Sequence, residues 1–155
     1  MFTKETYQLR RRELAESLSS GIILLLGNEE SSINFKDNIY PFRQDSSFLY
    51  FFGIDRPDLT AIIDIDEQKT TLFGDDLSVE HIIWMGAQPL LADQAERVGV
   101  TNTAKGNDVQ EYLTTAAKKK RKVHYLPPYR PENSIKLHQL LGIPLSPLLM
   151  VLQAI

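Results

Sequence analysis

The sequence predicts a single α/β domain, spanning residues 1–155, in which helices pack on a mixed β-sheet. Segments with the pattern of strands alternate with segments that have the pattern of helices, and one pair of strands forms a hairpin. A length of 155 residues, with 43% apolar and 24% charged residues, is typical of one globular domain with a sizeable buried core.

A helix is expected first, over residues 3–18. Apolar residues recur there at helical spacing between Tyr7 and Leu18. Thr3 is a suitable N-cap, and Gly21 is a suitable residue at which the helix ends.

Strands are expected next. GIILLLG (21–27) is a short apolar run between glycines, which predicts a strand buried on both faces. FLYFFGI (48–54) predicts a second strand. In TAIIDIDEQKTTLFGDD (60–76), isoleucines alternate with aspartates before the turn EQK, and this pattern predicts a hairpin.

The second half of the chain alternates between helices and one strand. Ser78 is a suitable cap for the first of these helices, and Asn107 with Gln110 resembles a capping box for the third. The expected helices cover 79–86, 89–99, 108–120 and 131–142, and the expected strand covers 122–126.

Composition narrows the classes of function. The chain has no cysteine, no apolar run long enough for a membrane span and no apolar signal segment near its start. A net charge of −3 argues against nucleic acid as the main partner. We therefore expect a cytoplasmic protein without a nucleic-acid or membrane partner. The apolar residues 143–155 indicate that the chain continues there or needs a partner surface.

Charge is unevenly distributed, which suits self-association or docking but is also typical of solvated faces. Residues 55–80 contain eight acids and two bases, and residues 118–136 contain seven bases and one acid. The run KKKRKV (118–123) follows a predicted helix, so we interpret its lysines as cations at a helix end rather than as a localisation signal. Asp75 and Asp76 are interpreted in the same way, as acids that favour a helix N-terminus.

No metal, phosphate-loop or nucleophile motif is present, and the three histidines are isolated in the sequence. Residues 39–58 instead concentrate six aromatic residues around the triplet Arg43, Gln44 and Asp45. A buried Arg43–Asp45 pair that fixes a loop is the favoured interpretation of the triplet. The alternative is that Arg43 binds substrate.

Trp84 is the only tryptophan, and it lies in HIIWMG among other large apolar residues. A short helix buries one stripe, so these residues cannot all face inward. Ile82, Ile83 and Met85 suffice for the buried stripe, which leaves Trp84 free to project. From the residues alone, a core position and a contact position for Trp84 remain about equally supported.

A resemblance to a known protein family adds to the predictions made from the residues. YPFRQDSSFLYFFGIDRPD (40–58) closely resembles a motif in the N-terminal domain of Xaa-Pro aminopeptidases (aminopeptidase P) and of their relatives prolidase and creatinase. TTLFGDD and EHIIWMG look like the hairpin, acidic loop and tryptophan segment of the same domain. The resemblance follows nearly the whole chain in order. It implies a ribonuclease H-like fold, with about six strands in a mixed sheet and helices on both faces.

The resemblance also implies roles for named residues. In this family, catalysis belongs to a following domain in which two Asp, one His and two Glu hold two metal ions, usually manganese. None of those ligands has a counterpart here, so this chain alone is expected to be inactive. Trp84 and Gly86 match a segment whose tryptophan reaches the substrate pocket of a neighbouring subunit. The residues that match the structural part of the motif are Arg43, Gln44, Asp45 and Gly53.

The expected function is therefore an N-terminal domain that forms oligomers and walls the active site of a Xaa-Pro aminopeptidase. The implied partners are its own catalytic domain, further copies of the same protein (a dimer or tetramer) and a peptide with proline at its second position. A prolidase, which takes dipeptides, is the close alternative. A non-catalytic relative that binds peptides or histones, and a creatinase-like amidinohydrolase, remain open.

Overall fold

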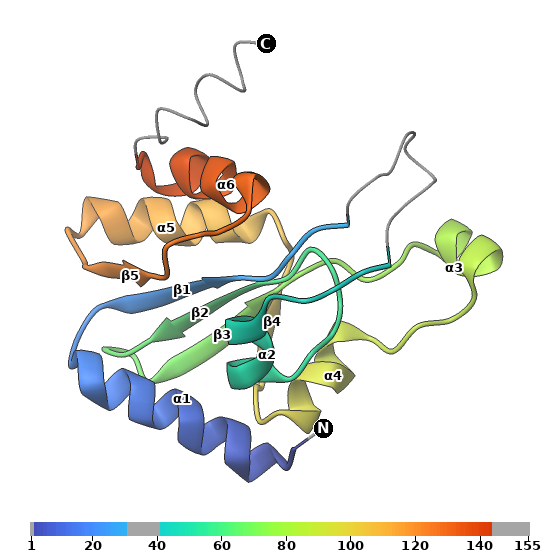
Figure 1. Ribbon diagram of the computed structural model, residues 1–155, viewed down its shortest axis with the longest axis horizontal. Coiled ribbons are helices and arrows are strands. Elements are labelled where there is room, and N and C mark those ends of the chain that lie inside the picture. The colour runs from blue at the N-terminus through green and yellow to red at the C-terminus, as the bar shows by residue number, and fades with distance from the viewer. Residues whose placement is uncertain (1, 31–40, 144–155) are drawn as a thin grey trace.

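The structure, a computed structural model, describes residues 2–30 and 41–143 and shows a five-stranded mixed sheet with helices on both faces (Figure 1). The strands are β1 (Ile22–Leu26), β2 (Thr60–Asp64), β3 (Lys69–Phe73), β4 (Asn102–Ala104) and β5 (Val123–Tyr125). The helices are α1 (Lys4–Leu18), α2 (Ser46–Phe52), α3 (Val79–Met85), α4 (Leu91–Arg97), α5 (Asp108–Lys118) and α6 (Pro131–Leu141). The predicted α/β class is confirmed.

The strand order is β4-β3-β2-β1-β5. The β2–β3 hairpin and the β1–β2 pair are antiparallel, whereas β5 runs parallel to β1 and β4 runs parallel to β3. The predicted hairpin is therefore confirmed, and the described sheet has five strands rather than about six. The three-residue strand β4 was not expected from the sequence, because three residues are too few for a pattern of alternation.

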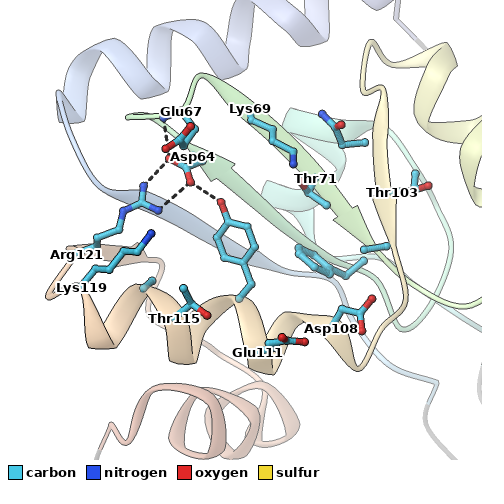
Figure 2. A pocket seen from close by; sticks show the side chains of 15 residues that line it. Asp64, Glu67, Lys69, Thr71, Thr103, Asp108, Glu111, Thr115, Lys119 and Arg121 are labelled. Carbon is cyan, nitrogen blue, oxygen red and sulfur yellow. Dashed lines mark hydrogen bonds and ion pairs between the residues drawn. The ribbon is translucent and has the colours of Figure 1, made fainter.

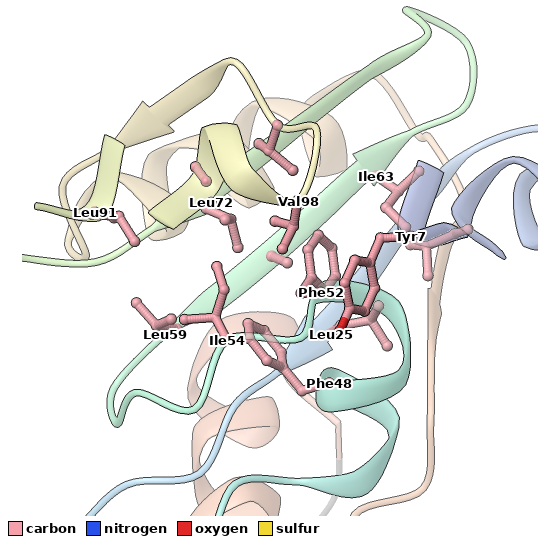
Figure 3. Close-up of a cluster of buried hydrophobic side chains, with 14 residues drawn as sticks. Tyr7, Leu25, Phe48, Phe52, Ile54, Leu59, Ile63, Leu72, Leu91 and Val98 are labelled. Carbon is pink, nitrogen blue, oxygen red and sulfur yellow. The ribbon is translucent and has the colours of Figure 1, made fainter. Parts of the chain in front are cut away.

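Two cores lie on opposite faces of the sheet, and β1 contributes to both. Ile23 and Leu25 pack with α1, α2 and α4 in the cluster shown in Figure 3. Ile22 and Leu24 pack with α5 and α6 on the other face. A strand covered on both faces has no polar side to expose, which explains the continuous apolar run of β1.

The segment 48–54 forms part of α2 and not the predicted strand. The carboxylate oxygen Oδ1 of Asp45 accepts a hydrogen bond from the backbone N–H of Phe48 (2.9 Å), which satisfies an amide at the helix start. The helix ends at Gly53, whose φ of 63° is left-handed. Phe48 and Phe52, four residues apart, bury one face of this helix against the first core (Figure 3).

Other helix ends agree only in part with the sequence prediction. Thr3 and Ser78 cap α1 and α3 as expected. Asn107 makes no side-chain cap, so the predicted capping box is wrong. The first helix ends before Gly21, with Ser19 at a positive φ of 71°. In the described residues, no helix has both the length and the apolar character that a membrane span requires.

Candidate functional site

Gln44 is the buried centre of the Arg43–Gln44–Asp45 triplet, with 3% of its surface exposed. Its Oε1 accepts from the backbone N–H groups of Asn28 (2.8 Å) and Asp45 (3.1 Å). Its Nε2 donates to the carbonyl oxygens of Ile54 (3.1 Å) and Arg56 (2.8 Å). One side chain thereby joins the loop after β1, the start of α2 and the loop after α2.

The predicted buried pair between Arg43 and Asp45 is wrong. Arg43 is exposed, and no ion pair joins it to Asp45 in the described part of the chain. Asp45 is half-buried and caps α2, while the backbone carbonyl of Arg43 accepts from Asn28 Nδ2 (3.0 Å). The polar loop is thus fixed by amide and backbone hydrogen bonds, which avoid the cost of burying two charges.

Gly53 and Gly86, the two predicted structural glycines, have different surroundings. A Cβ atom on Gly53 would lie 2.2 Å from the hydroxyl oxygen of Tyr7, so this position requires glycine for space as well as for its positive φ. Gly86 has a φ of 81°, but no atom lies within 4 Å of a Cβ placed there. Gly86 is therefore required only by the backbone conformation where α3 ends.

Trp84 lies on α3 and is 82% exposed. In Figure 1, α3 stands away from the sheet, beyond the helices that cover its faces. The expectation that Ile82, Ile83 and Met85 form a buried stripe is wrong for the two isoleucines, because both are exposed and Ile83 is 75% exposed. The side chain of Met85 lies outside the described part of the chain. Val79 and Leu90 are exposed as well, and the exposed apolar side chains of this segment, which we call the α3 platform, are Val79, Ile82, Ile83, Trp84 and Leu90.

A polar groove, with a volume of about 550 Å³, lies between α5 and the β3–β4 side of the sheet (Figure 2). At one end is Asp64, which is 1% exposed. Its Oδ1 accepts from Arg121 Nη2 (2.5 Å) and its Oδ2 from Arg121 Nη1 (3.0 Å), so the ion pair is bidentate. The hydroxyl of Tyr112 donates to Oδ2, and the backbone N–H of Glu67 donates to Oδ1 (3.0 Å).

These contacts lower the pKa of Asp64 and raise the pKa of Tyr112. Burial raises the pKa of Asp64, but the hydrogen bonds from Arg121, Tyr112 and Glu67 outweigh burial and hold this pKa below its usual value. Burial, together with the hydrogen bond to Asp64, raises the pKa of Tyr112 to about 12. The carboxylate stays ionised and the phenol stays protonated at neutral pH. The cluster therefore joins the β2–β3 hairpin to α5 and holds no group ready to exchange protons near neutral pH.

The three histidines lie on three different elements, α3, β5 and α6, and each ring nitrogen is close to one polar partner. His81 Nδ1 is 2.8 Å from Ser78 Oγ, and His124 Nε2 is 2.8 Å from the carbonyl oxygen of Ser20. His138 Nδ1 is 2.7 Å from the carbonyl oxygen of Ile143. Across residues 2–30 and 41–143, no three His, Asp or Glu side chains gather as metal ligands would. These residues do not fit a dinuclear metal site.

The charged segments noted in the sequence contribute to the fold. Asp76 accepts from the backbone N–H of Leu91 (2.8 Å), the first residue of α4, and pairs with Arg56 at 3.3 Å. Lys118 lies in the last turn of α5, where a cation is favourable. Arg121, from the same basic run, forms the ion pair with Asp64. No local pattern indicated this pair, because the two residues are 57 positions apart in the chain.

Comparison with known proteins agrees with the fold. Residues 7–125 match the model of the family described as aminopeptidase P, N-terminal domain. Human Xaa-Pro dipeptidase is 30% identical over 116 residues, which are 70% of this chain and 24% of that protein. A probable Xaa-Pro aminopeptidase of Penicillium rubens is 34% identical over 91 residues, which are 57% of this chain and 18% of that protein.

Solved structures of aminopeptidases P also superpose on this chain. Aminopeptidase P from E. coli superposes with a TM-score of 0.63 at 25% identity, over 74% of this chain and 27% of that one. Proline aminopeptidase P II from Yersinia pestis has a TM-score of 0.75 at 20% identity, over 91% of this chain and 33% of that one, and shows the shared fold. This chain thus spans about a quarter of the length of the human relative and less than a fifth of the fungal one. With three quarters of its residues matched by one family model, the chain belongs to the aminopeptidase P N-terminal domain family.

Proposed function

We propose that this chain is the N-terminal domain of a cytoplasmic Xaa-Pro aminopeptidase, where it forms oligomers and walls the active site of a neighbouring subunit. In this proposal Trp84 packs against the substrate, a peptide with proline at its second position. The proposal agrees with the names of the relatives, which are Xaa-Pro aminopeptidases and dipeptidases, and with the small share of their length that this chain covers.

The exposure of the α3 platform is the observation that carries the proposal. Trp84 and Ile83 are 82% and 75% exposed, and none of the α3 residues Val79 to Trp84 belongs to either buried core. A tryptophan exposed to this degree, among exposed apolar neighbours, is typical of a contact surface. An indole face also suits the flat apolar ring of a prolyl residue.

The chemistry itself belongs, in this proposal, to a catalytic domain of the same protein. Two divalent metal ions there, manganese in the expectation from the family, would activate a water molecule for peptide hydrolysis. The described residues of this chain offer no ligand set for those ions. We therefore assign to this chain the positioning of substrate and the contact between subunits, and we expect no turnover from residues 1–155 alone.

A Xaa-Pro dipeptidase is the second candidate, since human Xaa-Pro dipeptidase is among the relatives. Chain-length preference separates the two. An aminopeptidase cleaves Xaa-Pro peptides of three or more residues, whereas a dipeptidase cleaves Xaa-Pro dipeptides alone. A non-catalytic peptide- or histone-binding protein would cleave neither.

The test is made on the full-length protein that contains this domain, with Trp84→Ala, Trp84→Phe and, as a matched control, Tyr50→Ala. Tyr50 is half-exposed on α2, outside the α3 platform. Trp84→Ala should lower kcat/KM for a Xaa-Pro tripeptide by roughly thirtyfold, about the effect of losing 2 kcal/mol of aromatic packing. Trp84→Phe should recover part of this loss, and Tyr50→Ala should retain activity.

Measurements of stability and of tryptophan fluorescence test whether Trp84 is a surface residue or a core residue. In the 155-residue chain, Trp84→Ala should leave the thermal midpoint nearly unchanged, and acrylamide should quench the single tryptophan strongly. Blue-shifted, shielded emission together with a large fall in the midpoint would show that Trp84 is a core residue. Unchanged kcat/KM in an oligomeric Trp84→Ala enzyme would remove the role in substrate binding.

A further inference from the structure

Residues 77–90 connect β3 to α4 and include α3, which stands away from the sheet (Figure 1). We call this segment the α3 arm. Across the described part of the chain, the hydrogen bonds of residues 77–89 stay within the arm; the N–H of Gly86, for example, donates to the carbonyl oxygen of Ile82 (2.9 Å). No described side chain of the arm belongs to either buried core. The direction in which the arm points therefore depends on how its two ends are held.

Asp76 closes the base of the α3 arm. Its Oδ1 accepts a hydrogen bond from the backbone N–H of Leu91 (2.8 Å), so the residue before the arm is joined directly to the residue after it. Leu91 is 3% exposed in the first core, which fixes this end of the arm to the body of the domain. The same oxygen of Asp76 also accepts from Nη1 and Nη2 of Arg56, at 3.3 Å each.

Arg56 bridges both ends of the arm at once. Its Nη2 donates to the backbone carbonyl of Asp75 on the entering side, and its Nη1 donates to Oε1 of Gln94 (3.1 Å) on α4. The side chain of Arg56 is only 12% exposed. A planar guanidinium can hold several acceptors in one fixed geometry, and its bonds to a carboxylate are stronger than neutral hydrogen bonds. Because Arg56 belongs to the aromatic motif 40–58, that motif reaches the base of the arm.

We propose that Arg56 and Asp76 form a clamp that sets the orientation of the α3 arm, and that Arg56 is thereby a positioning residue for Trp84. This inference rests on the proposed role of Trp84 in substrate binding. The seven residues of α3 span about 10 Å, so a rotation of about 10° at the base moves the far end by about 2 Å. Misplacement of a substrate-binding group by about 1 Å can lower a rate by roughly a hundredfold.

The test on the full-length protein compares Arg56→Met with Trp84→Ala and with the double variant. Methionine keeps an unbranched apolar stem but has no N–H donor. An arm that holds the productive orientation for about a tenth of the time should raise KM for a Xaa-Pro tripeptide about tenfold, with little change in kcat, because bound substrate captures the competent orientation. In the Trp84→Ala background, Arg56→Met should have no further effect. Arg12→Met, which removes an exposed arginine on α1, should leave both constants unchanged.

Asp76→Asn tests the clamp with little risk to folding. Asparagine keeps an oxygen for the N–H of Leu91 but loses the charge that Arg56 meets. In the 155-residue chain, time-resolved fluorescence anisotropy of the single tryptophan reports the motion of the arm without any assay of activity. Asp76→Asn and Arg56→Met should both increase the nanosecond motion of Trp84, whereas Arg12→Met should not.

These measurements separate the clamp from the proposed function. Unchanged anisotropy in both clamp variants would overturn the clamp, whatever the activity of the enzyme. An effect of Arg56→Met on kcat/KM that is equally large with and without Trp84 would also overturn it, because Arg56 would then act by another route. If Trp84→Ala itself leaves kcat/KM unchanged, the proposed function fails, and the anisotropy still decides whether the clamp orients the arm.

Discussion

Replacement of Gln44 by leucine should destabilise the domain far more than removal of its charged neighbour Arg43. Gln44 is buried and makes four hydrogen bonds, all to backbone groups. Leucine has a similar volume but can neither accept nor donate. The N–H of Asn28 and the carbonyl of Ile54 would then remain buried without these partners, whereas the partners at Asp45 and Arg56 are partly accessible to water.

The size of the destabilisation follows from the two backbone groups left unpaired, the N–H of Asn28 and the carbonyl of Ile54. A buried polar group left unpaired costs about 1–3 kcal/mol, so Gln44→Leu should cost about 2–6 kcal/mol. That is a large part of the roughly 5–15 kcal/mol by which a domain is typically stable. At a slope of about 2 kcal/mol per molar urea, the unfolding midpoint should fall by roughly 1–3 M.

Urea unfolding followed by far-UV circular dichroism measures this effect, with Arg43→Ala as the matched control. Arg43 is exposed, so its removal should change the free energy of unfolding by less than about 0.5 kcal/mol. A larger loss in Arg43→Ala than in Gln44→Leu would refute this reasoning. It would restore the charged pair as the stabilising feature of the triplet.

Two further predictions concern the glycines and the buried carboxylate. Gly53→Ala should lower the thermal midpoint more than Gly86→Ala, because both have a positive φ but only Gly53 lies against Tyr7; equal shifts would show that space at Gly53 is not limiting. The Asp64 interactions should stabilise the fold fully above about pH 4 and be lost as the pH falls, because the pKa of Asp64 is lower in the folded chain than in the unfolded chain. Asp64→Asn should therefore be less stable at pH 7 and should lose less stability than the parent chain between pH 5 and pH 3 in urea titrations; parallel acid profiles would show that Asp64 does not contribute to this dependence.

Short-range patterns in the sequence were enough for several parts of this fold. The glycine-bounded run of β1, the alternation of the β2–β3 hairpin and the Pro131–Gly142 limits of α6 each follow from local backbone preferences or from burial along one segment. The motif at 40–58 likewise indicated the family, which the match over residues 7–125 confirms. These features depend on residues that are close together in the chain.

Other elements of the fold could be identified only from the tertiary structure. The run 48–54 is apolar at nearly every position, so its period does not separate helix from strand; the cap by Asp45 and the packing of Phe48 and Phe52 on β1 and α1 select the helix. The strand β4 exists because β3 offers it a parallel edge.

Long-range contacts also decided which polar residues are buried and which groups they bond to. The sequence places Arg43 and Asp45 within reach of each other, but the fold gives Gln44 four backbone partners and turns Arg43 to solvent. Asn28 and Asn133 meet although they are 105 positions apart, and they do so because β1 and α6 are brought together by the parallel pairing of β1 with β5. The sequence by itself therefore determined most of the local elements, apart from α2 and β4, and the family. Only the packed structure decided which polar groups are buried, because burial depends on what distant segments cover.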